Sequence, residues 1–301
     1  MSKILVIGAQ NIDIFTHNKQ DYNLHDSNIT DIKFSFGGVG RNIAENIKRL
    51  DCDISFLTVF GNDIFSTQAQ NSLEEMGIKT THSKVCDHVN SVYIGILDKD
   101  NDLFLGLNDM KIVEELNTEF MIKHKDYINS FDILVIDNNL TEDTIKHIVN
   151  NHNKTIIMDA VSAHKVHKLQ SILHKIDYVK LNHIECIELT KEDTLENQIK
   201  ELQKLNANTV IITNQDKDIT VVDKNVTSFK TIPCETIVNA SGAGDGFISG
   251  FIKGVSLDKS IKESIDYAKK VAYITLLSDD ATNKELTYEK VKNYETIYRV
   301  Q

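Results

Sequence analysis

Short, continuous runs of apolar residues recur along the chain, separated by stretches in which apolar residues return every three to four positions. The runs have the length of strands buried on both faces of a sheet, and they lie at residues 3–8, 54–60, 133–136, 155–158, 178–181 and 209–213. The other stretches predict helices at 66–76, 141–150, 169–175, 184–190, 195–205, 247–255, 260–277 and 287–298. This alternation predicts an α/β fold with a mostly parallel sheet and right-handed crossovers.

Two segments break this rhythm and predict a small sheet outside the main one. Residues 91–107 contain two stretches of period-two alternation around an acidic loop, which is the pattern of a hairpin. Residues 14–36 are polar with a weak alternation near their end. We expect one domain over residues 1–301, with a β lid from about 14–36 and 84–110 that closes over a substrate. A further hairpin is predicted at 219–222 and 226–230.

The composition narrows the range of partners. A net charge of −11 without a long basic run argues against a nucleic-acid partner, which needs Lys and Arg to replace counterions. No apolar run approaches the roughly 20 residues that span a membrane, so no membrane partner is expected. The four cysteines lie far apart and form no Cys-x-x-Cys pair, which predicts neither a zinc site nor a redox pair. Free thiols fit a reducing compartment, and we expect a cytoplasmic protein.

A glycine-rich turn at residues 239–246 stands between an apolar, strand-like stretch at 236–238 and a predicted helix. Such a turn binds anions, because the first backbone N–H groups of a helix are unpaired and its dipole is positive there. Gly242 and Gly244 let the backbone approach a ligand closely. Asp245 would repel a phosphate, but it suits a base that takes the proton of an attacking hydroxyl. The alternative for Asp245 is a helix N-cap.

A second glycine-rich turn, at residues 37–42, opens a helix whose apolar face starts at Ile43. Asn11 and Asp13 follow the first predicted strand, where ligands bind in open α/β sheets, so they are candidates for binding hydroxyl groups. Turn chemistry explains these two residues equally well. Two such turns, about two hundred residues apart in the chain, predict two binding positions, one for a small polar molecule and one for a phosphate.

Four short motifs together resemble those of the ribokinase-like (PfkB-type) carbohydrate kinases over essentially the whole chain. They are Asn11-Ile12-Asp13, Gly37-Gly38-x-Gly40-x-Asn42, Asn182-His183-Ile184-Glu185 and Gly242-Ala243-Gly244-Asp245. The resemblance implies a three-layer ribokinase-like fold, in which helices flank a mostly parallel central sheet and a small β-sheet forms a lid. It also implies phosphoryl transfer from ATP, with Mg²⁺, to an alcohol. Within the family, residues 25–28, 33–44, 107–110 and 159–163 are most similar to enzymes that phosphorylate the 5′-hydroxyl of pseudouridine.

The resemblance also implies a role for each matching residue. Asp245 would be the catalytic base, and Gly242, Ala243 and Gly244 would offer backbone N–H groups to the transferring phosphoryl group. The residues expected to bind the acceptor are Asn11, Asp13, Ser27, Gly38, Arg41, Asn42, Asn108 and Asn139. Those expected near the nucleotide are Asn182, Glu185, Thr213, Ser241 and Asn283, with Glu185 contacting Mg²⁺ through water and Asn239 a candidate ligand for a monovalent cation such as K⁺.

Three functions stay open from the sequence: a kinase acting on pseudouridine, a kinase acting on another nucleoside or a free sugar, and a catalytically weak sugar-binding relative. The loop at 214–218 contains no glycine where relatives place them near the nucleotide, which favours the third function, whereas the intact Asp245 favours a kinase. Asn182 as a turn residue and Glu185 as a first-turn acid are the structural alternatives. Because the helix dipole stabilises a carboxylate, Asp245 is expected to be ionised at pH 7. The open edge of a lid needs cover, so a homodimer through the lid is expected.

Overall fold

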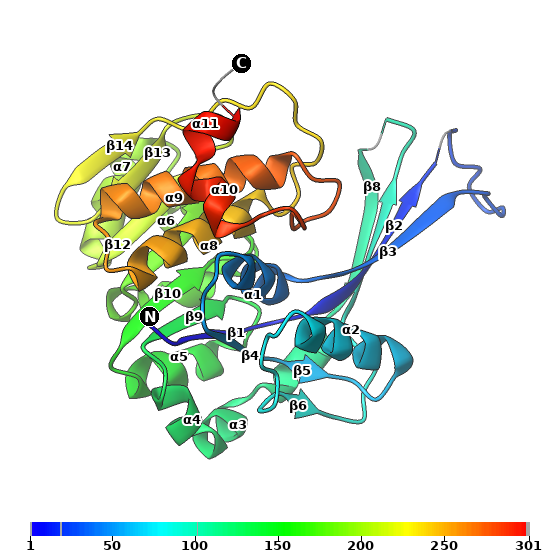
Figure 1. Ribbon diagram of the computed structural model, residues 1–301, viewed down its shortest axis with the longest axis horizontal. Coiled ribbons are helices and arrows are strands. Elements are labelled where there is room, and N and C mark those ends of the chain that lie inside the picture. The colour runs from blue at the N-terminus through cyan, green and yellow to red at the C-terminus, as the bar shows by residue number, and fades with distance from the viewer. Residues whose placement is uncertain (1, 19, 101, 299–301) are drawn as a thin grey trace.

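The computed structural model of the protein describes residues 2–18, 20–100 and 102–298, so residues 1, 19, 101 and 299–301 lie outside the description. The body is an eight-stranded sheet between two layers of helices (Figure 1). In spatial order its strands are β14 (Val226–Phe229), β13 (Ile219–Val222), β12 (Thr209–Thr213), β11 (Tyr178–Asn182), β10 (Thr155–Asp159), β9 (Ile133–Asp137), β1 (Ile4–Ile7) and β4 (Ile54–Leu57). The strands from β12 to β4 run parallel, and β13 and β14 form an antiparallel edge. The predicted mostly parallel sheet is therefore confirmed.

Successive residues of the central strands point into two different cores, which explains why these strands read as continuous apolar runs. Ile4 and Val6 pack with helices on one face, and Leu5 and Ile7 pack with helices on the other. The first face carries α1 (Val39–Arg49), α2 (Ile64–Glu75), α8 (Ala243–Ser256) and α9 (Ile261–Leu276), with α10 (Tyr288–Lys292) and α11 (Tyr294–Tyr298) beyond α9. The second face carries η1 (Lys111–Glu115), α3 (Thr118–Lys123), α4 (Lys125–Asn129), α5 (Glu142–Asn151), η2 (Val166–Leu169), η3 (Leu173–Lys175), α6 (His183–Thr190) and α7 (Leu195–Lys204).

A second sheet, of four strands, extends from the body as a separate arm (Figure 1). Its strands are, in order, β3 (Asp31–Gly37), β2 (Asn11–His17), β7 (Val92–Leu97) and β8 (Leu103–Asp109). We call this sheet the lid. Asn11 pairs with Gly37 at its base, where β2 leaves the body and β3 returns to it. The strand β6 (Lys84–Val85), which falls inside the range expected for the lid, pairs instead with β5 (Val59–Phe60), and residues 19 and 101 of that range lie outside the described residues.

Three predicted elements are divided in the structure, because an apolar pattern reports burial and not the continuity of the backbone. The strand predicted at 54–60 is split between β4 and β5, which belong to different sheets. The helix predicted at 169–175 is replaced by the short 3₁₀ segments η2 and η3. The helix predicted at 287–298 is divided into α10 and α11.

The strand-like stretch predicted at 236–238 is not a strand. Ile237 and Val238 are 56% and 50% exposed, although both are strongly apolar. The backbone N–H of Val238 donates to the carbonyl of Leu276 at the end of α9, so this segment is tied to a helix terminus and not to a neighbouring strand. Among the described helices, none has both the length and the apolar character that crossing a bilayer requires.

Candidate active site

The turn that opens α8 has the geometry of an anion site. Gly242 lies in the left-handed region with φ +76°, and a Cβ at this position would collide with the carbonyl oxygen of Ala281. The N-cap residue, Gly242, has no side chain that could cap α8, and among the first N–H groups that of Ala243 has a long 3.4 Å bond to the carbonyl of Ala240. Gly242, Ala243 and Gly244, the predicted anion hole, therefore lie together at the positive end of the helix dipole.

The predicted catalytic base lies in the first turn of α8 and is only 9% exposed. Asn42 of α1 donates a 2.8 Å hydrogen bond from Nδ2 to Oδ2 of Asp245. Burial, followed by the nearby carboxylate of Asp159, raises the pKa of Asp245 to about 7, while Asn42 and Lys180 act in the opposite direction. The helix dipole was expected to keep Asp245 ionised at pH 7, but desolvation outweighs the dipole and moves the pKa in the opposite direction. At this pH the carboxyl is divided between its protonated and ionised forms.

A buried lysine lies behind the same turn. Lys180, in the middle of β11, is 6% exposed, and its Nζ is 3.2 Å from Oδ2 of Asp159. The same Nζ is 2.9 Å from the position that a Cβ on Gly244 would take. Burial lowers the pKa of Lys180, but the carboxylates of Asp159, Glu185 and Asp245 outweigh burial, so this pKa is raised. A fixed positive charge therefore stands behind the backbone of the anion-binding turn.

Lys180 is not among the residues predicted from the sequence, although the chain carries a signal for it. A lysine interrupts the apolar run at 178–181, and charged side chains are almost never buried without a partner. A lysine inside a central strand that ends at Asn182 therefore points to carboxylates at the end of that strand.

The Asn-x-x-Glu motif forms a capping box at the start of α6. Asn182 Oδ1 accepts a 2.8 Å hydrogen bond from the Glu185 backbone, and Glu185 Oε2 accepts one of 2.7 Å from the Asn182 backbone. Glu185 is only 1% exposed; burial raises the pKa of its carboxyl, and Lys180 lowers it. No three metal-ligating side chains come together anywhere in the described part of the chain, so a metal contact of Glu185 stays a prediction.

On the acceptor side, Asn11 and Asp13 lie on β2 at the base of the lid, beside the turn before α1. Gly38 has φ +95°, and a Cβ there would lie 2.9 Å from the carbonyl oxygen of Ala9. Asn11 is 9% exposed, and its Oδ1 has no hydrogen-bond partner among the described residues. Burial raises the pKa of Asp13 to about 6 against the attraction of Arg41. A free amide oxygen and a carboxyl at one turn suit the binding of hydroxyl groups.

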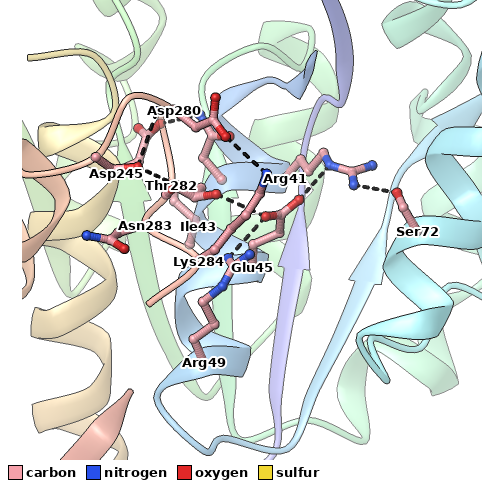
Figure 2. A network of polar contacts seen from close by, with 12 residues as sticks. Arg41, Ile43, Glu45, Arg49, Ser72, Asp245, Asp280, Thr282, Asn283 and Lys284 are labelled. Atoms are coloured by element: carbon pink, nitrogen blue, oxygen red, sulfur yellow. Dashed lines mark hydrogen bonds and ion pairs between the residues drawn. The ribbon is translucent and has the colours of Figure 1, made fainter. Parts of the chain in front are cut away.

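Arg41, which was predicted to bind the acceptor, has its guanidinium in the protein interior (Figure 2). It donates to Glu45 Oε1 at 2.8 Å, to the Ala69 carbonyl at 2.9 Å and to Ser72 Oγ at 2.7 Å. Glu45 also accepts a 3.1 Å hydrogen bond from Thr282 Oγ1 in the loop after α9 (Figure 2). These bonds fix α1 to α2 and to that loop, so the contacts of Arg41 in this structure stabilise the packing of α1.

The other residues predicted at the acceptor lie on the lid and at the end of β9. Asn108 is exposed on β8 of the lid, and Ser27 is exposed in the loop that joins the lid strands β2 and β3. The backbone N–H of Asn139 donates to Asp137 Oδ1 at 2.9 Å, and its Oδ1 accepts from Lys165 Nζ. The lid residues are therefore free to meet a ligand, whereas the Asn139 amide is already engaged.

The residues predicted at the nucleotide mostly bond to the backbone around them. Asn239 Oδ1 accepts a 2.8 Å hydrogen bond from the Ser241 N–H, and its Nδ2 donates to a carbonyl of the loop after α9 at 2.9 Å. Asn283 donates from Nδ2 to a carbonyl at the end of α9 at 2.6 Å. Thr213 donates from Oγ1 to a carbonyl of β11 at 3.4 Å. These contacts fix the loops on this side of the site.

Comparisons with known proteins cover almost the whole chain. The sequence model of the pfkB family carbohydrate kinases matches residues 1–287. The chain is 26% identical over 296 residues to pseudouridine kinase from Escherichia coli (strain K12), which covers 96% of this chain and 95% of the relative. It is 24% identical over 298 residues to guanosine-inosine kinase from Exiguobacterium acetylicum, covering 93% and 96%. The structure is similar to that of ribokinase from Thermotoga maritima, with a TM-score of 0.85, 21% identity and coverage of 98% and 100% of the two chains. The ribokinase-like fold expected from the motifs is thus confirmed.

Proposed function

Because the chain belongs to the pfkB family of carbohydrate kinases, we propose that it transfers the γ-phosphoryl group of ATP to the 5′-hydroxyl of pseudouridine. The family consists of phosphotransferases that act on an alcohol group of a sugar or nucleoside, and ribokinase-like kinases use ATP and a divalent metal. The choice of pseudouridine as the acceptor is the more specific part of the proposal. It is supported by the similarity to the Escherichia coli enzyme over 96% of the chain.

The observation that carries the proposal is the contact between the two glycine-rich turns. Asn42 follows the turn that opens α1, and Asp245 follows the turn that opens α8. Their 2.8 Å hydrogen bond brings a group suited to binding hydroxyls against a buried carboxyl at an anion site. An acceptor hydroxyl bound by the first turn would therefore meet both a base and the phosphoryl group that it attacks.

The reaction follows from these positions. The 5′-oxygen forms a bond to the γ-phosphorus, the bond from that phosphorus to the β–γ bridging oxygen breaks, and ADP leaves. The hydroxyl proton passes to the Asp245 carboxylate. A base with a pKa of about 7 suits this role, because it exchanges protons near neutral pH. The lid would exclude water and so favour transfer over hydrolysis.

Two sets of groups in the protein would compensate the negative charge on the transferring phosphoryl group. The backbone N–H groups of Gly242, Ala243 and Gly244 would bind its oxygens, and the ammonium of Lys180 would add positive charge from behind the turn. Glu185 would hold Mg²⁺ through water, and the ion would neutralise negative charge on the phosphates. We place Thr213, Ser241 and Asn283 beside the nucleotide, and Asn239 stays a candidate for K⁺.

The acceptor would be held from both the turn and the lid. Asn11 and Asp13 would bind ribose hydroxyls, since the Asn11 oxygen is unpartnered among the described residues. Gly38 would let the sugar approach the backbone. Ser27 and Asn108, exposed on the lid, would contact the base once the lid closes.

The decisive experiment measures ADP release from ATP–Mg²⁺ with pseudouridine, uridine, guanosine, inosine and ribose in parallel, for the wild-type chain and for Asp245→Asn. The expected result is the highest kcat/KM with pseudouridine and a loss of about 10²–10⁴-fold in the variant. Faster turnover of guanosine or inosine would show that the acceptors are those named for the Exiguobacterium acetylicum relative. Faster turnover of ribose would show that the acceptor is a free sugar. No turnover with any acceptor would leave a sugar-binding protein.

We also infer a homodimer through the lid, working in the cytoplasm. The lid carries exposed apolar side chains on both of its outer strands, at Ile32, Phe34, Leu103, Phe104, Leu105 and Leu107. An open edge strand with apolar side chains pairs readily with a second copy. The four cysteines are free thiols, which agrees with a reducing compartment.

A further inference from the structure

Asp137, the last residue of β9, accepts hydrogen bonds from three separate segments. Its Oδ2 accepts from the backbone N–H of Ala9 at 2.8 Å and from that of Gly40 at 3.0 Å. Its Oδ1 accepts from the backbone N–H of Asn139 at 2.9 Å. The residue is completely buried. One carboxylate thus joins the chain after β1, the turn that opens α1 and the chain after β9.

The backbone around this carboxylate is shaped to let it approach. A Cβ on Gly40 would lie 2.9 Å from Asp137 Oδ2, and a Cβ on Gly8 would lie closer still. A Cβ essentially never comes within 3.0 Å of another heavy atom, so either substitution would displace the carboxylate. Gly8, Gly40 and Asp137 therefore form one fitted unit. The two oxygens of an Asp carboxyl can accept from three converging N–H donors. Burial raises the pKa of this carboxyl, and the bonds from Ala9 and Asn139 lower it.

The segments held by Asp137 carry the acceptor side of the site. Ala9 lies two residues before Asn11, and its carbonyl accepts from the backbone N–H of Arg41 at 3.2 Å. Gly40 lies two residues before Asn42, which bonds to the catalytic base. The free oxygen of Asn11 and the amide of Asn42 therefore take their positions from backbone that one carboxylate holds in place.

A second branch leads from Asp137 toward the lid. Asn139, fixed by its backbone bond to Asp137, accepts from Lys165 Nζ. That Nζ also lies 3.9 Å from Sδ of Met110, at the point where the lid rejoins the body after β8. The base of the lid and the acceptor turn are thus connected to the same carboxylate.

We propose that Asp137 is the positioning residue of the acceptor half-site: it orients the Asn11 and Asn42 amides through backbone bonds and does not itself touch the acceptor. This inference rests on the proposed function, because that function makes the two amides acceptor ligands. In this proposal Asp137 does not position the nucleotide half-site around Gly242 and Lys180.

The test compares Asp137→Asn and Asp137→Ala with the wild-type chain. In the Asn variant the amide oxygen can still accept from Ala9 and Gly40, whereas the amide NH2 replaces Oδ1 and faces the Asn139 N–H as a second donor. In the Ala variant all three bonds are lost. We expect acceptor KM to rise about 10-fold for Asn and about 100-fold or more for Ala, with ATP KM within about two-fold of the wild-type value.

The matched control is Asp132→Asn, directly before the other end of the same strand. Asp132 is exposed and accepts a 2.9 Å hydrogen bond from the Lys3 backbone, so it has the same chemistry outside the site. We expect its acceptor KM to be unchanged. If Asp137→Ala does not fold, Asp137→Asn decides, because it keeps the size of the side chain.

The inference would be overturned if Asp137→Asn raised acceptor and ATP KM equally, or if both folded variants kept the wild-type acceptor KM. Calorimetric titration of the acceptor without ATP separates this result from a failure of the proposed function. Wild-type binding without turnover, with affinity falling in the order Asp, Asn, Ala at position 137, would remove the kinase proposal and keep the positioning role. Turnover with no loss in the variants would do the reverse.

Discussion

Asn42 and Asp245 lie 203 residues apart in the chain, and their side chains are joined by a 2.8 Å hydrogen bond between Nδ2 and Oδ2. The bond connects the first turn of α1 with the first turn of α8, two helices that pack side by side on the same face of the sheet. It is also one of two contacts that lower the pKa of a carboxyl which burial raises to about 7. The proton affinity of the base is therefore set in part by the acceptor side of the site.

Replacing Asn42 by Ala should move the pH dependence of catalysis. Asp245 must be ionised to accept a proton, so kcat/KM should fall as the pH decreases through about 7 in the wild-type chain. Without the Asn42 bond the pKa of Asp245 rises further, and the acidic limb should shift to higher pH. A profile of kcat/KM from pH 5.5 to 9 measures this. Asn151→Ala, which removes an exposed amide bonded to its own helix, should leave the limb in place; an unmoved limb in Asn42→Ala would contradict the prediction.

Asp245→Asn should be more stable than the wild-type chain above pH 7. The folded-state pKa of Asp245 is raised from 3.8 to about 7, so the unfolded chain releases this proton first as the pH rises. The free energy of unfolding of the wild type therefore falls between about pH 4 and pH 7, and the variant lacks this loss. The gain should be near zero below pH 4 and reach up to about 4 kcal/mol above pH 7. Urea unfolding at pH 4 and pH 8 measures it, and an equal difference at both pH values would show that another effect is responsible.

Lys180→Met should weaken both stability and catalysis. The variant leaves the buried carboxylates of Asp159 and Glu185 without their cation, which should cost about 3–5 kcal/mol in the free energy of unfolding. Losing positive charge behind the anion turn should lower kcat by about 10²–10³-fold. Lys191→Met, at an exposed lysine that ends α6, is the control and should change neither. A folded Lys180→Met chain with wild-type kcat would exclude the proposed role toward the phosphoryl group.

Gly242→Ala should be far more harmful than the same change at Gly77. Both glycines have nearly equal, positive φ angles, +76° and +74°. A Cβ at Gly77 meets only the flexible end of Lys48, so strain alone should cost about 1–2 kcal/mol. At Gly242 the Cβ also collides with the backbone carbonyl of Ala281, so the anion turn must move and activity should be lost. Equal losses of stability, with activity kept in both variants, would contradict this account.

A charge on the outer strand of the lid should disrupt the proposed dimer. Leu105 is 44% exposed on β8, and Leu195 is 43% exposed at the start of α7, away from the lid. Light scattering at micromolar concentration should give a dimer mass for the wild type and for Leu195→Glu, and a monomer mass for Leu105→Glu. A monomeric wild type would remove the dimer from the proposal.

Local patterns in the sequence were enough to predict the mostly parallel sheet, most of the helices and both glycine-rich turns. A central parallel strand is apolar on both sides, as Ile4 and Leu5 show by entering opposite cores, so it reads as an unbroken run. A turn that requires a residue with positive φ, such as Gly242, is likewise recognisable in the sequence by its glycine. These features depend only on neighbours along the chain.

The roles of polar residues inside the site required the tertiary structure. Arg41 sits among the motif residues, yet its guanidinium is used to fix α1 against α2. Lys180 and Asp137 have no motif, and each acquires its partners only when several strands end at the same edge of the sheet. The protonation of Asp245 reversed the sequence-based expectation, because the helix dipole is a local property whereas desolvation depends on everything that packs around the carboxyl. The sequence by itself thus determined most of the elements and the kind of chemistry, and the tertiary structure alone decided which polar groups meet and how burial shifts their pKa values.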